Sequence, residues 1–338
     1  MDRRNKPSAL AATPAPPPQA RVDLVGDRVT AVLPSGESVE ILLTGATVLS
    51  WKGAVHGGEP AERLFLSEGA VLDGSKAVRG GIPIVFPVFG QSPADVPTSK
   101  LPQHGLARTS RWEFLGKSTS ESDGKAGAGA GAGASSSTKA AAGSSNGVQL
   151  DFGLSAASAD PALRALWPYD FALLYRVTLA PGSLATAIVV TNEGSAAFDF
   201  QVLLHTYLRV DDIAQVGVDG LAGASYLDKV EGFKEKTQAA TGPVDITGET
   251  DRVYVPAQGA SQPLTVLQGG RPLYGVQRDN LADVVVWNPW TEKVKSIGDF
   301  APKDGYKNML CVEPGSVSSW QTLEPNDAFE GAQVITLL

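Results

Sequence analysis

The chain has 338 residues, a formal net charge of −8 and a single cysteine, Cys311. With a pI near 5.0, it is not expected to bind nucleic acid or an anionic membrane surface. One cysteine excludes an internal disulfide, and no apolar run reaches the roughly 20 residues that cross a bilayer. We therefore expect a monomeric cytoplasmic protein, with plastid targeting left open by the Ala/Pro-rich start of the chain.

Composition divides the chain into a tail, one domain and an insertion. Residues 1–20 are mainly Ala and Pro with a few charges, which cannot bury enough apolar surface to offset chain entropy, so we predict a disordered tail. Residues 21–338 read as a single domain. Within it, residues 118–146 centre on AGAGAGAGASSS, which predicts a flexible surface insertion between two strands with no chemistry of its own.

The domain reads as a series of short β-rich segments separated by turns of Gly, Pro and Ser. One helical turn is expected at 162–167, and no stretch keeps a 3.6-residue periodicity. This pattern predicts an all-β fold, one large antiparallel β-sandwich. The main expected strands are 28–33, 39–43, 46–51, 148–154, 171–179, 184–192, 198–208, 250–255, 284–287, 309–313 and 333–337.

Residues 76–112 hold the densest group of ligand-binding side chains. The segment carries Arg79, Gln103, His104 and Arg108 in a backbone rich in Gly and Pro. Such side chains can hydrogen-bond several oxygens of a polar ligand at once, and the glycines at 80 and 81 would let the backbone approach it closely. Any one of these residues taken alone suits an ordinary loop or sheet edge equally well.

Two further residues are candidates for proton transfer. Of the three histidines, His56 reads as an exposed hairpin tip and is set aside. His205 lies in an apolar strand, where it is either a packed core residue or a general acid. Glu313 ends an apolar strand directly before a Pro-Gly turn, so it is either an exposed strand-end acid or a general base whose pKa partial burial would raise.

The motifs taken together are more specific than any one residue. RGGIP-x-x-FP-x-FG at 79–90, LPQHG-x-AR at 101–108 and then a strand with W-x-F resemble the hexose-6-phosphate branch of the aldose 1-epimerase (galactose mutarotase-like) family. The resemblance runs from about residue 22 to the C-terminus. It implies the supersandwich of that family, and interconversion of the α and β anomers of glucose 6-phosphate by acid–base ring opening and reclosure.

The resemblance also implies roles for individual residues. It makes His205 the general acid and Glu313, in CVEPG, the general base. It places Arg79 and Arg108 on the phosphate side, a role that suits the charge and forked geometry of guanidinium. Gln103 and His104 would then lie nearer the sugar hydroxyls.

Three other positions are less decided. Asp251, in DRVY, resembles a family aspartate that contacts sugar hydroxyls, and an Asx turn explains it equally well. Trp287 and Trp290, in VVWNPW, would form an aromatic wall for a sugar ring or pack in the core. Arg111 lies outside the matched motif and reads as an ordinary strand-entry charge.

Anomer exchange requires only proton transfers, so we expect no metal and no other cofactor, and a small-molecule hexose phosphate as the partner. Two rival functions remain open. An aldose 1-epimerase acting on unphosphorylated sugar is disfavoured by the two motif arginines. A non-catalytic sugar-phosphate-binding protein is disfavoured by the presence of both an acid and a base.

Overall fold

The computed structural model describes residues 18–55, 57–119 and 147–338. The predicted tail, except residues 18–20, and the predicted insertion, except Ser118 and Thr119, lie outside the described residues, as does His56. The expectations for these segments therefore stay predictions. Ser118 and Thr119 themselves belong to a strand that pairs with residues 148–149, so the strand runs two residues further than expected.

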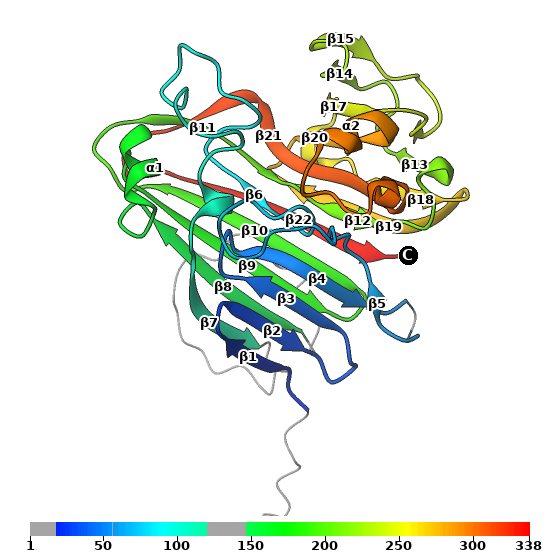
Figure 1. The fold of residues 1–338 in the computed structure, drawn as a ribbon, viewed down its shortest axis with the longest axis horizontal. Helices are drawn as coiled ribbons and strands as arrows, with labels where there is room; N and C mark the ends of the chain where they lie inside the picture. Colours follow the sequence, from blue (N-terminus) through cyan, green and yellow to red (C-terminus); the bar gives the residue numbers. More distant parts are fainter. Residues whose placement is uncertain (1–17, 56, 120–146) are drawn as a thin grey trace, which may run out of the picture.

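The described residues form three antiparallel sheets, which confirms the predicted all-β class (Figure 1). The nine-stranded sheet has the order β16 (Val244–Asp245), β13 (Val216–Asp219), β18 (Leu264–Gln268), β19 (Arg271–Asp279), β22 (Ala328–Leu337), β10 (Ser183–Asn192), β9 (Phe171–Ala180), β8 (Val148–Ser155), β7 (Glu113–Thr119). The eight-stranded sheet has the order β15 (Lys234–Thr237), β14 (Ser225–Asp228), β17 (Thr250–Val255), β20 (Asp283–Asn288), β21 (Met309–Leu323), β11 (Phe198–Leu204), β6 (Ile84–Val85), with β12 (Tyr207–Arg209) also paired to β21.

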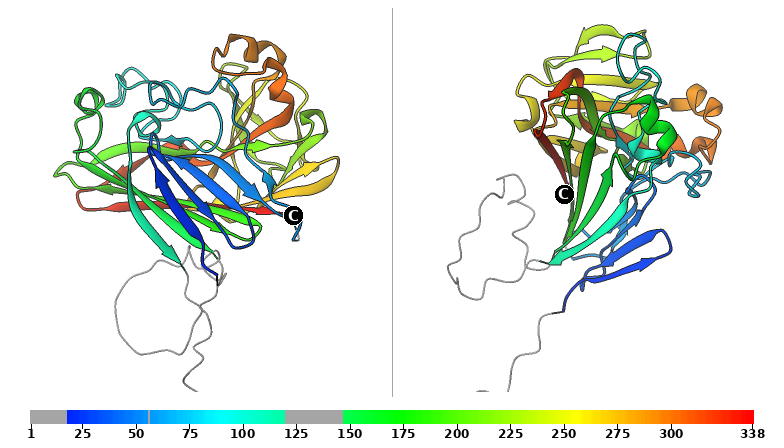
Figure 2. Two further views of the ribbon diagram at one scale, coloured as in Figure 1. Left: turned by 60° about the horizontal axis from the view of Figure 1, so that its bottom comes forward. Right: turned by 90° about the vertical axis from the view of Figure 1, so that its left-hand side faces the viewer.

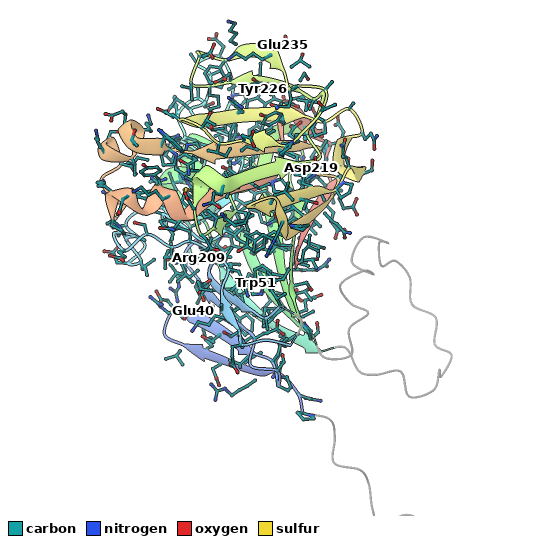
Figure 3. All side chains as sticks on the ribbon, turned by 90° about the vertical axis from the view of Figure 1, so that its right-hand side faces the viewer. Glu40, Trp51, Arg209, Asp219, Tyr226 and Glu235 are labelled. Atoms are coloured by element: carbon teal, nitrogen blue, oxygen red, sulfur yellow. The ribbon has the colours of Figure 1, made fainter. Side chains whose placement is uncertain are left out.

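The third sheet contains β1 (Arg21–Val25), β2 (Arg28–Val32), β3 (Ser38–Leu42), β4 (Thr47–Gly53) and β5 (Ala61–Glu62). It lies beside the β7–β10 part of the nine-stranded sheet (Figure 2). Viewed from the side, Glu40 of this sheet lies toward one end of the molecule and Trp51 nearer the middle, while Tyr226 and Glu235 of the eight-stranded sheet lie at the other end (Figure 3).

Helices are few in the described part of the chain and short. They are α1 (Pro161–Leu166) and α2 (Trp290–Ser296), with 3-10 turns η2 (Ala107–Thr109), η4 (Ile213–Gln215), η5 (Gly259–Ser261) and η6 (Lys303–Asn308). The predicted helical turn is α1, which begins after Asp160, whose side chain accepts a hydrogen bond from the Ala162 N–H (2.8 Å). None of the helices in these ranges is long and apolar enough to cross a membrane.

One large apolar core joins the three sheets. Strand β8 alternates strictly between buried and partly buried residues, as a strand with one core face should. Its Phe152 packs in the same cluster as Tyr175 of β9, Trp51 of β4 and Phe86 beside β6. A smaller apolar cluster of Val85, Leu203, Val253, Val285 and Val317 occupies a second region of the eight-stranded sheet.

Two predicted strands differ from the structure at the candidate site. The expected strand 198–208 is broken at His205 and Thr206, where the backbone turns and the two halves, β11 and β12, pair with different parts of β21. The expected end of a strand at Glu313 is wrong, because β21 continues through Pro314 and Gly315 to Leu323. Pro314 lies opposite Val284 of β20, and on the other side of β21 it falls between the residues that pair with β12 and those that pair with β11, so its missing N–H interrupts neither pairing.

The glycines of the RGG motif have a different role from the one expected. A Cβ on Gly80 would lie 2.5 Å from the Phe65 carbonyl oxygen, and a Cβ on Gly81 would lie 2.0 Å from that of Val48. Both glycines have positive φ angles. They let the chain pass closely against its own backbone, so packing and not ligand approach requires them.

Replacing Gly81 by alanine should therefore destabilise the protein strongly. Gly270→Ala is the matched control, because its φ of +75° resembles the +67° of Gly81 but nothing lies within 4 Å of its Cβ position. The control should lose about 1–2 kcal/mol from left-handed strain alone. Gly81→Ala should lose at least about 2 kcal/mol more, since the backbone must shift. Urea unfolding measures both, and equal losses would contradict the packing role.

Candidate functional site

His205 lies at the break between β11 and β12, where it leaves the regular ladder. Its backbone N–H donates to the Pro83 carbonyl (2.9 Å), which ties it to the RGGIP segment. Its ring lies nearly parallel to that of Tyr207, with centroids 4.7 Å apart and an interplanar angle of 10°. The rings of Trp287 and His205 are nearly perpendicular, with centroids 6.0 Å apart. The imidazole is thus held between aromatic rings in a fixed orientation.

Glu313 lies within β21 and is only 1 % exposed. Its Oε1 is 3.4 Å from Nδ1 of His205, longer than an ordinary hydrogen bond. Among the described residues, neither His205 Nδ1 nor Glu313 Oε2 has a hydrogen-bond partner. Buried polar atoms are almost always satisfied, so these two unpartnered atoms make the pair a candidate for contact with a ligand. The alternative of an exposed strand-end acid for Glu313 is wrong.

The surroundings shift the pKa of each group away from its ordinary value. Burial raises the pKa of Glu313 well above its usual range, and the nearby Asp251 carboxylate adds to this effect while Lys229 opposes it. Burial lowers the pKa of His205 well below its usual range, with a further contribution from the positive charges of Arg108, Arg79 and Lys229. The carboxylate is therefore a stronger base than a solvated one, and the imidazole is neutral.

Arg79 and Arg108 both lie close enough to act on His205. Arg79 donates through Nε to Asp299 Oδ1 (3.1 Å) and through Nη1 to the Tyr207 hydroxyl (3.2 Å). Arg108 donates through Nη2 to the Gln103 carbonyl (2.6 Å). Burial lowers the pKa of Arg108 to about 10, and Arg79 contributes to this shift. Two guanidinium groups in one region form a site suited to an anion.

Gln103 and His104 flank this region. Gly90 N–H donates to Nδ1 of His104 (3.2 Å), so in the neutral ring Nε2 carries the proton. The His104 ring lies 5.9 Å from that of His205. His104 is buried with φ of +66°, while Gln103 is exposed and places its amide nitrogen 3.5 Å from His104 Nε2. The His104 ring therefore lies beside that of His205, and Gln103 lies next to His104. The predicted placement of both side chains near the sugar hydroxyls stays a prediction.

Asp251 is brought to the same face of the eight-stranded sheet. Asp251 pairs in register with Trp287, Trp287 with Cys311, and Cys311 with Tyr207, so one row of side chains crosses β17, β20, β21 and β12. The Asp251 carboxylate lies 3.1 Å from the ammonium of Lys229. The Asx-turn alternative is wrong, since Asp251 sits inside β17 and its side chain pairs with this lysine.

The sequence reasoning missed three side chains of the site: Lys229, Tyr207 and Asp299. The Lys229 ammonium lies over the ring of Phe89, 4.6 Å from its centroid, and contacts Asp251. No motif around Lys229 signalled this position. Tyr207 follows His205 by two residues, and in the continuous strand that was expected both side chains would lie on one face of the sheet. This spacing could have indicated that Tyr207 belongs to the site.

The two tryptophans and Arg111 differ in whether they lie near His205. Trp287 contacts the rings of His205 and Tyr207, whereas Trp290 starts α2 and packs on Tyr306 with centroids 5.6 Å apart. Of the two tryptophans, only Trp287 has a ring contact with His205 among the described residues. Arg111 is exposed at the entry to β7, as expected.

One group of metal-ligand type occurs among the described residues. It comprises His205, Cys311 and Glu313, whose donor atoms all lie within 4.8 Å of one another. Burial raises the pKa of the Cys311 thiol well above its usual range, which disfavours the thiolate that a metal needs. The positive charges of Arg79 and Lys229 also act on His205 and oppose a further cation. The expectation of a reaction without metal or cofactor stays a prediction.

Comparison with known proteins identifies the class first. The crystal structure of a Salmonella typhimurium protein that is provisionally described as a mutarotase superposes on this chain with a TM-score of 0.73. The two sequences are 28% identical, and the superposition covers 94% of this chain and 93% of the Salmonella chain. The fold is therefore the mutarotase sandwich that the motifs implied.

The family follows from the sequence matches. The aldose 1-epimerase family model matches residues 27–336, and the chain belongs to that family of epimerases. A Cenchrus ciliaris relative, provisionally named glucose-6-phosphate 1-epimerase, is 34% identical over 86% of this chain and 79% of its own. An Escherichia coli relative with the same provisional name is 32% identical over 87% of this chain and 84% of its own.

The buried carboxyl should lower stability at neutral pH. Burial raises the pKa of Glu313, so the unfolded carboxyl ionises first and stability falls as pH rises above its unfolded pKa of about 4.3. Glu313→Gln removes this cost. We expect the variant to be more stable than the wild type at pH 7, by a few degrees or less in Tm, since ~1 kcal/mol corresponds to ~2–4 °C in domains of 150–250 residues.

The advantage should disappear below about pH 4, where both states of the wild type are protonated. The exposed Glu324→Gln is the control and should change stability little at either pH. Thermal unfolding of the three proteins at the two pH values gives the result. An advantage of Glu313→Gln that stays constant with pH would show that ionisation is not its cause.

Proposed function

We propose that this enzyme is a hexose-6-phosphate 1-epimerase that interconverts the α and β anomers of glucose 6-phosphate. One observation carries the proposal: an unsatisfied acid–base pair, His205 and Glu313, lies within the electrostatic reach of two arginines. The names of the Cenchrus ciliaris and Escherichia coli relatives support the same substrate.

The reaction needs two proton transfers, one at each of the two oxygens bonded to the anomeric carbon. Glu313 takes the proton from the anomeric hydroxyl while His205 gives one to the ring oxygen, and the bond between that oxygen and the anomeric carbon breaks. The aldehyde then rotates about its first carbon–carbon bond, and reversal of both transfers closes the other anomer. The two reacting oxygens share one carbon, which fits an acid and a base whose atoms lie 3.4 Å apart.

A phosphate group on the substrate would also help the acid step. The positive charges that hold the imidazole neutral include Arg79 and Arg108. A phosphate dianion held between these guanidinium groups would offset their charge and favour the imidazolium form. This electrostatic effect favours a phosphorylated sugar over the unphosphorylated alternative. Family membership likewise disfavours the purely non-catalytic alternative.

We infer further that the enzyme acts as a monomer in the cytoplasm on a small-molecule substrate, without nucleic acid. The net charge of −8 and the single cysteine, which is buried and free, support this inference. Size-exclusion chromatography with light scattering measures the oligomeric state, and a mass of twice 35.2 kDa would contradict it.

His205→Asn and Glu313→Gln should each reduce anomer exchange of glucose 6-phosphate by about 100-fold or more, the usual contribution of a positioned acid or base. Binding of the sugar phosphate should remain, because both replacements are polar and similar in size. Exchange is measured by NMR of the two anomers, with Glu324→Gln as the control. Near-normal exchange in either variant would remove that residue from the mechanism.

Arg79→Ala and Arg108→Ala should each lower kcat/KM for glucose 6-phosphate by roughly 10- to 150-fold, the equivalent of a charged hydrogen bond of about 1.5–3 kcal/mol. The loss on glucose should be much smaller, because glucose lacks the anion. The exposed Arg111→Ala is the matched control and should change neither rate. Equal losses on the two sugars would favour the epimerase of unphosphorylated sugars instead.

A further inference from the structure

Arg79 is held in place by two partners on different segments. Its Nε donates to Asp299, before η6, and its Nη1 donates to the hydroxyl of Tyr207 in β12. The side chain remains 26 % exposed, so the other N–H groups of the guanidinium can face a ligand. The direction in which this arginine presents its charge is therefore fixed by Asp299 and Tyr207.

The segment that carries Asp299 is itself tied to the backbone of Arg79. The hydroxyl of Ser67 donates to the Asp299 carbonyl (2.7 Å) and accepts from the Ala301 N–H (2.8 Å). The Ser67 N–H donates to the Arg79 carbonyl (3.0 Å). These bonds hold Arg79 and its carboxylate partner as one unit.

Tyr207 connects this unit to the proposed acid. Its hydroxyl accepts from Arg79, while its ring lies flat against the His205 imidazole at 4.7 Å. The tyrosine is 1 % exposed, and Trp287 packs against it edge-on at 5.8 Å. Any displacement of the hydroxyl is therefore transmitted to the surface on which the imidazole rests, because the ring has no room to move alone.

We propose that Tyr207 and Asp299 are positioning residues that couple phosphate recognition by Arg79 to the orientation of His205. In this arrangement the phosphate of the substrate raises kcat and not only affinity. Binding energy from a group that does not react is then used at the reacting carbon. The inference rests on the proposed function and adds to it two residues that no motif assigned.

Tyr207→Phe tests the coupling, because it keeps the ring that supports His205 and removes only the hydroxyl that receives Arg79. We expect kcat for glucose 6-phosphate to fall by about tenfold, the scale of one charged hydrogen bond, with a much smaller loss on glucose. Tyr274→Phe is the matched control, since Tyr274 is equally buried and its hydroxyl donates to the Arg209 carbonyl (2.7 Å) outside the site. The control should leave both rates unchanged.

A second measurement divides the substrate into two separate molecules, glucose and a phosphite dianion that stands in for the phosphate group. Phosphite dianion added to glucose should accelerate anomer exchange in the wild type, and this activation should be lost in Tyr207→Phe. Asp299→Asn keeps an oxygen that accepts from Arg79 but removes the charge, so it should retain part of the activation, whereas Asp299→Ala should abolish it. If Tyr207→Phe folds poorly, the coupling is still tested by the two Asp299 variants, of which the conservative Asp299→Asn should keep more phosphite activation than Asp299→Ala.

The outcomes separate the inference from the proposed function. If the wild type does not exchange the anomers of glucose 6-phosphate, the proposed function itself fails. If it does, but Tyr207→Phe changes only KM or lowers the rate on both sugars equally, the coupling is wrong and the function stands. Activation by phosphite that is equal in wild type and Tyr207→Phe would overturn the coupling as well.

Discussion

The structure depends at its centre on a buried carboxylate that its own fold leaves unsatisfied. Glu313 lies within a long strand, 3.4 Å from an imidazole nitrogen that also lacks a hydrogen bond among the described residues. Leaving such groups unpaired costs folding free energy, so the surrounding sandwich must supply enough apolar burial to hold them. Glu313 is held within β21, whereas His205 is held at the strand break by its backbone hydrogen bond to Pro83 and by its stacking on Tyr207.

Positively charged side chains outnumber the acidic ones that pair with them around this pair. Arg79, Arg108 and Lys229 surround it with positive charge, while Asp251 and Asp299 each neutralise one of these cations. Among the described residues Arg108 forms no ion pair with a carboxylate, and it donates to the Gln103 carbonyl instead. A protein with a net charge of −8 thus presents local positive charge where an anionic substrate group would bind.

The sandwich brings these groups together by strand register. Asp251, Trp287, Cys311 and Tyr207 come from four strands and form one row, because antiparallel pairing aligns them across the sheet. The break at His205 then turns the imidazole toward Glu313. Membership of the aldose 1-epimerase family fits this arrangement, since anomer exchange needs an acid and a base held at one carbon.

Residue pattern and motifs are enough to predict the fold class, the family and most of the candidate site. Alternating apolar segments and turn residues predict an antiparallel sandwich wherever local pattern decides the outcome, as in β8 and β9. The motifs carried Arg79, Gln103, His104, Arg108, His205, Asp251 and Glu313, which are fixed by residue type and spacing.

The arrangement of these residues depends on tertiary contacts that no local pattern predicts. The strand break at His205, the burial of Glu313 and the positions of Lys229 and Asp299 depend on contacts between segments far apart in the chain. The glycines at 80 and 81 likewise fit against backbone at Phe65 and Val48, which no local pattern reveals. Local sequence determines which backbone conformations have low free energy, but burial and strand pairing across the sheets determine which side chains come into contact.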